Sequence, residues 1–212
     1  MKNNPDIIWL DVAESSNDEA RKAIDSLDNL SVVAVRCQTS GRGQGTNSWE
    51  SAPGENLTFS IVLKDLDILP NQQIAISQIT ALAVVRFLAL HGIDAKIKLP
   101  NDIYVGDRKI CGILIENSLC AGKIKWSIVG IGINVNQTAF PSSLPNPTSI
   151  LLEKGYSAIT PDQNPGTSLD LELVLQEFHE IYSEYYSNFI ISSIEPNLNE
   201  LARLFQSKLL DL

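Results

Sequence analysis

The feature that most constrains the fold is a run of apolar residues that follows Pro70. From Asn71 to Leu90, Ile, Ala, Val and Leu residues fall on nearly every face of a helix. A helix without a polar face is buried inside a protein. Pro70 suits the start of such a helix and Gly92 suits its end. We therefore predict a central core helix over residues 71–90.

Length and charge limit the kinds of protein that the chain can be. Its 212 residues with 44% hydrophobic composition supply one well-buried core, and we expect a single domain over residues 1–212. Lys and Arg number 16 against 25 Asp and Glu, so the net charge is -9. An acidic surface repels phosphate backbones, which argues against DNA binding. An anionic substrate would need a local basic site.

The few sulfur and imidazole side chains point to a reducing compartment. Three cysteines do not build a disulfide framework, and no CxxC or HxxxH pair indicates a zinc site. Residues 1–10 lack the apolar run of a signal peptide, and no stretch reaches the length of an uncharged membrane span. We expect a cytoplasmic protein without membrane contact.

Hydrophobic patterns and turn signals predict an α+β fold. Strands are expected at residues 7–12, 31–37, 56–63, 95–98, 103–105, 110–116 and 124–134. Helices are expected at residues 17–27, 71–90, 169–191 and 197–209, and loops at 38–54, 137–147 and 160–168. The short links between the later strands favour antiparallel neighbours. We predict a mostly antiparallel mixed sheet with helices packed on one side.

The loop from Gln38 to Gly54 is rich in glycine and carries Arg42. Glycines leave backbone amides free to cradle an anion, and arginine can bind a carboxylate or phosphate with two hydrogen bonds. No Lys-Ser/Thr pair follows Gly45, so the loop is not a Walker P-loop, and its glycine spacing differs from the dinucleotide-binding fingerprint. A flexible surface loop is the alternative.

A second segment concentrates positive charge in this acidic chain. Within fourteen positions it holds Lys96, Lys98, Arg108 and Lys109, with Asp102 and Asp107 between them. A Pro-Asn turn separates Lys98 from Asp102 and would hold them at a constant distance. The segment is a candidate anion site, and a solvated hairpin tip with ordinary surface ion pairs is the alternative.

Glycines also mark one face of the predicted strand at residues 124–134. Alternation places Trp126, Ile128, Gly130, Gly132 and Asn134 on that face. Two neighbouring glycines leave the sheet bare, which is typical of a strand that a flat ligand or another backbone approaches closely. Close packing of a helix is the alternative.

Taken in order, these features resemble the catalytic domain of bacterial biotin-protein ligases of the monofunctional type. The motifs are Ser15-Ser16-Asn17, Gln38 with Gly41-Arg42-Gly43 and Trp49, Lys98-x-Pro-Asn-Asp102, Arg108-Lys109-x-x-Gly112-Ile-Leu-Ile-Glu116 and Gly130-Ile-Gly-Ile-Asn134. The resemblance covers residues 7–150. It implies the fold shared with class II aminoacyl-tRNA synthetases and lipoyl ligases. It also implies a two-step reaction in which biotin and ATP form biotinyl-5'-AMP, and a lysine of the biotin carboxyl carrier protein of acetyl-CoA carboxylase takes the biotinyl group.

The resemblance assigns the charged residues to the reacting groups. Arg42 would hold the biotin carboxylate and the phosphate, Lys109 the mixed anhydride, and Lys98 the nucleotide phosphates. Mg²⁺ would screen the pyrophosphate, with Asp102 as its candidate ligand. In an unbroken strand Lys109 and Gly112 would face opposite ways, so we expect a bulge or a late strand start near Lys109.

The resemblance assigns polar and flat residues to biotin and the adenylate. Ser15, Ser16 and Gln38 would contact the ureido ring, which offers two N–H donors and one carbonyl. Gly112, Gly130 and Gly132 would form a bare surface under the bicyclic ring, Trp49 would close over the ligand, and Asn134 would contact the adenylate. Asn17, Gly41, Gly43 and Gln44 complete the expected ligand-binding set.

The chain departs from the family pattern at several points. Leu99 stands where Trp is common, and Gln44 stands where some members carry a second Arg. No DNA-binding domain precedes Ile7, so we do not expect an operon repressor, and the small C-terminal β-barrel of the family is not expected within these residues. A lipoate or octanoate ligase or transferase, and a noncatalytic biotin-binding domain, are the alternative functions. A homodimer is possible on sequence grounds.

Overall fold

A computed structural model describes residues 6–64, 66, 68–155, 168–191 and 198–210 of the chain. Its strands are β1 (Ile7–Ala13), β2 (Val32–Gln38), β3 (Leu57–Lys64), β4 (Lys96–Lys98), β5 (Asp102–Val105), β6 (Arg108–Cys120) and β7 (Lys123–Ile133). Its α-helices are α1 (Ser16–Lys22), α2 (Ile74–Leu90), α3 (Ile150–Glu153), α4 (Leu171–Tyr186) and α5 (Leu198–Gln206). Short turns of 3-10 helix (Pro70–Gln72) and π-helix (Ser187–Ile191) adjoin α2 and α4.

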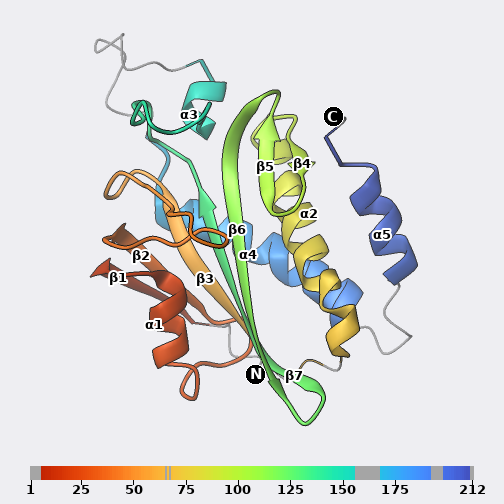
Figure 1. Cartoon of the computed structure of the whole chain (residues 1–212). Coiled ribbons are helices and arrows are strands. Elements are labelled where there is room, and N and C mark those ends of the chain that lie inside the picture. Colours follow the sequence, from red (N-terminus) through yellow and green to blue (C-terminus); the bar gives the residue numbers. More distant parts are fainter. Residues whose placement is uncertain (1–5, 65, 67, 156–167, 192–197, 211–212) are drawn as a thin grey trace.

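The seven strands form one mixed sheet in the order β1-β2-β3-β7-β6-β5-β4 (Figure 1). Among the described residues, each neighbouring pair is antiparallel except β1 and β2, which run parallel. The strands from β4 to β7 are joined by short turns, which keep successive strands antiparallel. The predicted mostly antiparallel mixed sheet is confirmed.

The two faces of the sheet are covered differently. Along β7, Val129, Ile131 and Ile133 point into the large core, where α2 and α4 pack. Ile128 points the other way, into a small apolar cluster that includes Ala20 of α1. Figure 1 shows α1 (red) and α4 (blue) on opposite sides of the sheet. The long helices therefore lie on one side, as expected, and α1 adds partial cover to the glycine-bearing face.

Helix α2 is the buried core helix that the sequence predicts. It begins at Ile74 rather than Asn71, because the residues after Pro70 first form a 3-10 turn. Its Phe87 packs edge to face on Phe178 of α4, with ring centroids 5.7 Å apart. Residues 70–90 are long and apolar enough to cross a membrane by length and composition, but most of this stretch is buried inside the molecule.

Several other boundaries differ from the prediction, and α5 ends at Gln206 rather than at residue 209. Helix α1 ends at Lys22, and a turn continues to Leu27 with bonds such as Ser26 N–H to the Ala23 carbonyl. Helix α4 begins two residues late because Asp170 caps it, its Oδ1 accepting from Glu172 N at 2.9 Å. Strand β6 extends well beyond the predicted 110–116 at both ends. The loop expected at 160–168 lies outside the described residues except for Ser168.

Candidate active site

One row of residues crosses five strands on the glycine-bearing face. Thr58 pairs with Gly132, Gly132 with Gly112, Gly112 with Asp102, and Asp102 with Lys98. Directly opposed residues in adjacent strands point to the same face of a sheet. Residues that are far apart in the sequence are therefore brought onto one side of the sheet.

A β-bulge places Lys109 on this same face. Ile103 pairs with Cys111 but Tyr104 pairs with Lys109, so Ile110 is an extra residue in β6. Because of this extra residue, Lys109 and Gly112 lie on the same face of the sheet rather than on opposite faces, and both line one cavity. The bulge expected near Lys109 is thus present. The Lys109 Nζ atom lies 2.7 Å from Oδ1 of Asp102, and this ion pair sits at the edge of the glycine surface.

The first cavity lies between α1, the glycine-rich loop and the glycine surface of β6 and β7. Its lining includes most of the expected ligand-binding residues: Ser15, Ser16, Asn17, Gln38, Arg42, Gly43, Gln44, Trp49, Asp102, Lys109, Gly112, Gly130 and Gly132. Gly41 packs under the Trp49 backbone instead, and a β-carbon there would clash with it. Nearly all of the predicted ligand-binding residues therefore line one cavity.

Buried polar side chains form one wall of the first cavity. The backbone N–H of Ser16 donates to Oε1 of Gln38 at 2.8 Å. The hydroxyl of Ser60 lies 2.8 Å from Oγ of Ser16 and 2.6 Å from Oδ1 of Asn17. Ser15, Ser16 and Asn17 are each less than 5% exposed. These contacts hold a set of donors and acceptors in place for a buried polar ligand.

The glycine surface is not bare in this structure. The indole of Trp49 lies on Gly112 and Gly132: an added β-carbon at residue 112 would lie 2.8 Å from Cζ3, and one at residue 132 would overlap Cε2. Asn17 covers Gly130 so closely that a β-carbon there would overlap its side-chain oxygen. Close packing of a helix, which was the alternative for this face, therefore accounts for Gly130. Gly112 and Gly132 make room for the flat indole ring.

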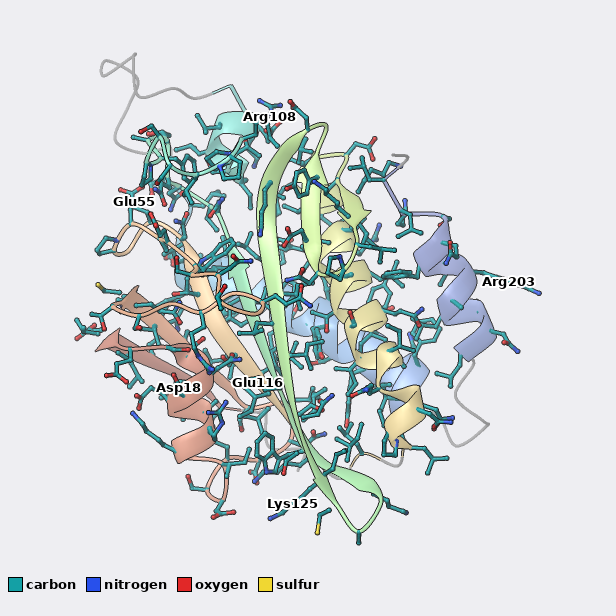
Figure 2. The ribbon with its side chains drawn as sticks, viewed as in Figure 1. Asp18, Glu55, Arg108, Glu116, Lys125 and Arg203 are labelled. Atoms are coloured by element: carbon teal, nitrogen blue, oxygen red, sulfur yellow. The ribbon has the colours of Figure 1, made fainter. Side chains whose placement is uncertain are left out.

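Arg42 lies in an ion-pair network at the mouth of the first cavity. Its Nη1 and Nη2 lie 3.2 Å and 3.0 Å from the two carboxylate oxygens of Glu116, and Nη2 lies 2.9 Å from Oδ1 of Asp18. Arg21 contacts the same two carboxylates, at 2.7 Å and 3.2 Å. Figure 2 shows Asp18 on α1 and Glu116 on β6 near each other. The terminal nitrogens of Arg42 thus pair with protein carboxylates, whereas its buried Nε has no hydrogen-bond partner.

Glu116 is strongly held in its charged form. Partial burial disfavours the carboxylate, but hydrogen bonds from Asn17 and Arg42 and the positive charges of Arg42 and Arg21 outweigh it. The pKa of Glu116 is therefore below its ordinary value. Sequence reasoning placed Glu116 in a motif without a role. Its alternation with Gly112 along β6 was the signal that it lies on the glycine-bearing face of the sheet.

A second cavity adjoins the first and shares Trp49 with it. Its lining is Asn47, Ser48, Trp49, Glu50, Asp102, Tyr104, Lys109, Asn134, Phe140, Ser143, Leu144, Pro145 and Pro147. Five residues line both cavities: Asn47, Ser48, Trp49, Asp102 and Lys109. The loop at 140–147 was predicted only as a loop, and its proline content was the sole hint of a defined shape.

Buried Asp102 Oδ1 makes no hydrogen bond but lies beside the Lys109 ammonium. Two further buried polar atoms, on side chains that line the second cavity, have no hydrogen-bond partner among the described residues. Trp49 Nε1 is a donor without an acceptor, and Asn134 Oδ1 is an acceptor without a donor. Asn134 is held in place because its Nδ2 donates to the Thr148 carbonyl at 2.8 Å. Buried polar atoms of this kind normally have partners, so their clustering here is typical of a ligand site.

Lys98 lines neither cavity. It shares the sheet face with Asp102, but its Nζ lies 4.4 Å from the centroid of the Tyr104 ring, which forms part of the second cavity. Arg42 and Lys109 therefore meet at the first cavity, whereas Lys98 reaches the second only through Tyr104. Within the described part of the chain, no group of three or more His, Cys, Asp or Glu residues could hold a metal ion.

Comparison with known proteins places this geometry among related chains. The family model for the biotin/lipoate A/B protein ligase family matches residues 9–134. The bifunctional ligase/repressor BirA of Bacillus spizizenii is 29% identical over 195 residues, covering 90% of this chain and 56% of that protein. The biotin–[acetyl-CoA-carboxylase] ligase of Paracoccus denitrificans is 32% identical over 158 residues, covering 71% of this chain and 64% of that protein.

The fold has a solved counterpart with ligands. The biotin protein ligase from Aquifex aeolicus in complex with biotin and ATP superposes with a TM-score of 0.77 and 25% identity, covering 98% of this chain and 79% of that one. The chain spans little more than half the length of the Bacillus relative.

Proposed function

Because this chain belongs to the biotin/lipoate A/B protein ligase family, we propose that it activates biotin with ATP and transfers it to a carrier protein. In the first step a biotin carboxylate oxygen bonds to the α-phosphorus of ATP, and the bond from that phosphorus to pyrophosphate breaks. In the second step a lysine amine of the carrier attacks the acyl carbon, loses a proton and releases AMP. The observation that carries the proposal is that two cavities meet at Lys109 and Asp102.

The first cavity suits the ureido end of biotin. That ring presents two N–H donors and one carbonyl, and an unmatched group would cost about 1 to 3 kcal/mol when buried. Gln38 Nε2 remains a donor while its Oε1 accepts from Ser16. The hydroxyls of Ser15 and Ser16 supply further acceptors on the same wall. Lipoate and octanoate carry no ureido ring and have no use for this set of polar groups, which favours biotin over both.

The second cavity suits the nucleotide. Trp49 presents one flat ring and a free Nε1 donor, and Asn134 presents a free Oδ1 acceptor. Bases and ribose carry N–H, O–H and ring nitrogen atoms that match both. The biotin carboxylate and the α-phosphate would then meet where the two cavities adjoin.

Positive charge is needed where the two substrates meet. Two anions about 4 Å apart repel by roughly 4 kcal/mol at an effective dielectric of 20. The Lys109 ammonium lies at this junction and would offset the repulsion, more so as charge develops in the transition state. Asp102 would contribute one carboxylate to Mg²⁺, whose remaining ligands would be phosphates and water, as is usual for this ion. When bound, the ion would neutralise charge on the leaving pyrophosphate.

The test uses the whole chain and measures each step. With biotin and ATP we expect pyrophosphate release and a bound biotinyl-5'-AMP, followed by label on a biotin carboxyl carrier domain of acetyl-CoA carboxylase when one is added. Calorimetry with biotin and with lipoate checks the substrate. Tighter binding of lipoate would overturn the substrate assignment, and biotin binding without pyrophosphate release would indicate a noncatalytic binding domain.

A further inference from the structure

Glu116 joins three separate parts of the molecule. It lies on β6, accepts from Asn17 Nδ2 at 2.8 Å and pairs with Arg21, both on α1. Its carboxylate also accepts hydrogen bonds from both terminal nitrogens of Arg42, which lies in the glycine-rich loop. A single carboxylate therefore connects that loop to the helix and to the strand that form the first cavity.

Backbone hydrogen bonds within the loop link the position of Trp49 to that of Arg42. Arg42 and Ser48 form an antiparallel bridge, Gly43 N–H donates to the Asn47 carbonyl at 2.8 Å, and Trp49 N–H donates to the Gly41 carbonyl at 2.9 Å. Residues 41–49 are thus a small hairpin with Arg42 in one arm and Trp49 at the end of the other. When Arg42 is anchored, the indole is anchored on the glycine surface.

The charges of the network balance within the protein. Arg21 and Arg42 carry two positive charges, and Asp18 and Glu116 carry two negative ones. A substrate anion that bound the terminal nitrogens of Arg42 would have to displace a carboxylate that is already well paired. This arrangement favours a structural use of those nitrogens, which leaves only Nε for a ligand.

We propose that Glu116 is a positioning residue, which fastens the hairpin at residues 41–49 over the site through Arg42 and thereby keeps the adenylate bound. The inference rests on the proposed function, because it concerns retention of the intermediate. Arg42 then acts chiefly as a latch, and Lys109 supplies the charge for the chemical step.

The test compares Glu116→Gln and Arg42→Gln with their double variant. We expect each single change to speed dissociation of biotinyl-5'-AMP about tenfold, or ~1.4 kcal/mol, in the range for coupled contacts. In the double variant, biotinyl-5'-AMP should dissociate at most about twofold faster than in the faster of the two single variants, because both changes break the same contact. In Glu116→Gln, whose side chain lines neither cavity, the rate of adenylate formation at saturating substrates and the affinity for biotin alone should change less than about threefold.

Glu172→Gln is the matched control. Glu172 pairs with Arg36 on the surface at 2.5 Å and lines neither cavity, so the same loss of charge there should leave dissociation unchanged. If Glu116→Gln lowers the melting temperature, Arg42→Gln breaks the same pair from the loop side and must show the same fast dissociation.

Two results would overturn the inference. One is retention of the adenylate by Glu116→Gln at the wild-type level. The other is a large loss of adenylate formation in Arg42→Gln but not in Glu116→Gln, which would make Arg42 a direct substrate contact. Failure of the wild-type chain to form any adenylate is a different outcome, since it refutes the proposed function itself.

Discussion

The indole of Trp49 lies directly on the backbone of Gly132. The three atoms that a β-carbon at residue 132 would meet first, Cε2, Cζ2 and Nε1, all belong to Trp49. Because Trp49 lines both cavities, the lack of a side chain at residue 132 determines the position of a residue that the two cavities share.

Gly132→Ala should displace Trp49. The methyl group needs space that the ring occupies, so the ring must move off the glycine surface and take the hairpin with it. We expect adenylate formation to fall roughly tenfold or more, a change of ~1.4 kcal/mol in activation free energy. Pyrophosphate release at saturating biotin and ATP is the measurement.

A double variant separates displacement of the ring from general damage to β7. In a Trp49→Ala background the clash is absent, so Gly132→Ala should cause little further loss. If the two losses instead add in full, the effect of Gly132→Ala does not act through Trp49.

Lys109 and Lys98 should differ sharply in their importance. Lys109 lines both cavities, whereas Lys98 lines neither and stacks on Tyr104. We expect Lys109→Gln to lower the rate of adenylate formation by about 100-fold, the scale for removing one charge-stabilising group. Lys98→Gln should lower it by less than about threefold. Single-turnover formation of the adenylate measures both.

Equal losses in the two variants would contradict this ranking. They would mean that Lys98 leaves Tyr104 and reaches the phosphates when the nucleotide binds. The affinity for biotin alone serves as the internal control, since neither substitution touches the Ser15–Ser16–Gln38 wall.

The side of the sheet that bears the site could be predicted because strand alternation has a strict period of two. Gly130, Gly132 and Asn134 were assigned to one face of β7. The structure places both glycines at the first cavity and Ile131, which lies between them in the sequence, in the core. A bulge or a late strand start near Lys109 could also be predicted, because the family resemblance assigns Lys109 and Gly112 to one site although regular alternation would place them on opposite faces.

The partners of Arg42 could not be predicted. Asp18 and Glu116 lie 24 and 74 positions away in the chain, and no local pattern says which carboxylate an exposed arginine will meet. The position of the indole on the glycines also could not be predicted. Glycines on a strand face indicate that something packs closely there, but they do not show whether it is a ligand or a protein side chain. The contact of Lys98 with Tyr104 could not be predicted for a related reason, because a diagonal contact between neighbouring strands depends on side-chain direction.

The cysteines should differ in reactivity. Cys111 is fully buried beneath the glycine face, and burial raises the pKa of its thiol, with Asp102 adding to the shift and Lys109 opposing it. Cys120 is exposed at the end of β6. Because the thiolate is the reactive form, a thiol reagent at neutral pH should label Cys120 and leave Cys111 intact. Peptide mass spectrometry identifies the labelled site.

Unfolding the protein provides the control for this labelling. In denaturant all three cysteines should react, which shows that Cys111 is protected by the fold. Labelling of Cys111 and Cys120 at equal rates in the folded protein would show that β6 opens readily beneath the site.

Stability should fall in mild acid because of His179. Its Nε2 lies 2.9 Å from the Leu30 carbonyl in a buried position, so the neutral ring donates there. Burial lowers the pKa of His179, although the Leu30 hydrogen bond and the charge of Glu180 oppose the shift. The unfolded chain therefore takes up a proton near its ordinary pKa of about 6.5, before the folded protein does.

The sign of the effect follows from that order. Above about pH 7.5 neither state is protonated, and His179 adds no pH dependence. As the pH falls through about 6.5 the unfolded state is favoured, by at most ~1.4 kcal/mol per pH unit for one proton, until the folded protein is protonated too. Glu116, whose pKa is lowered, loses its contribution only at more acidic pH, below the ordinary range of a carboxyl.

Urea unfolding between about pH 8 and pH 5.5 should show this slope in the wild type. His179→Gln, whose amide can still donate to Leu30, should remove much of the slope while keeping His91 unchanged, and an identical slope in both proteins would assign the pH dependence to other groups.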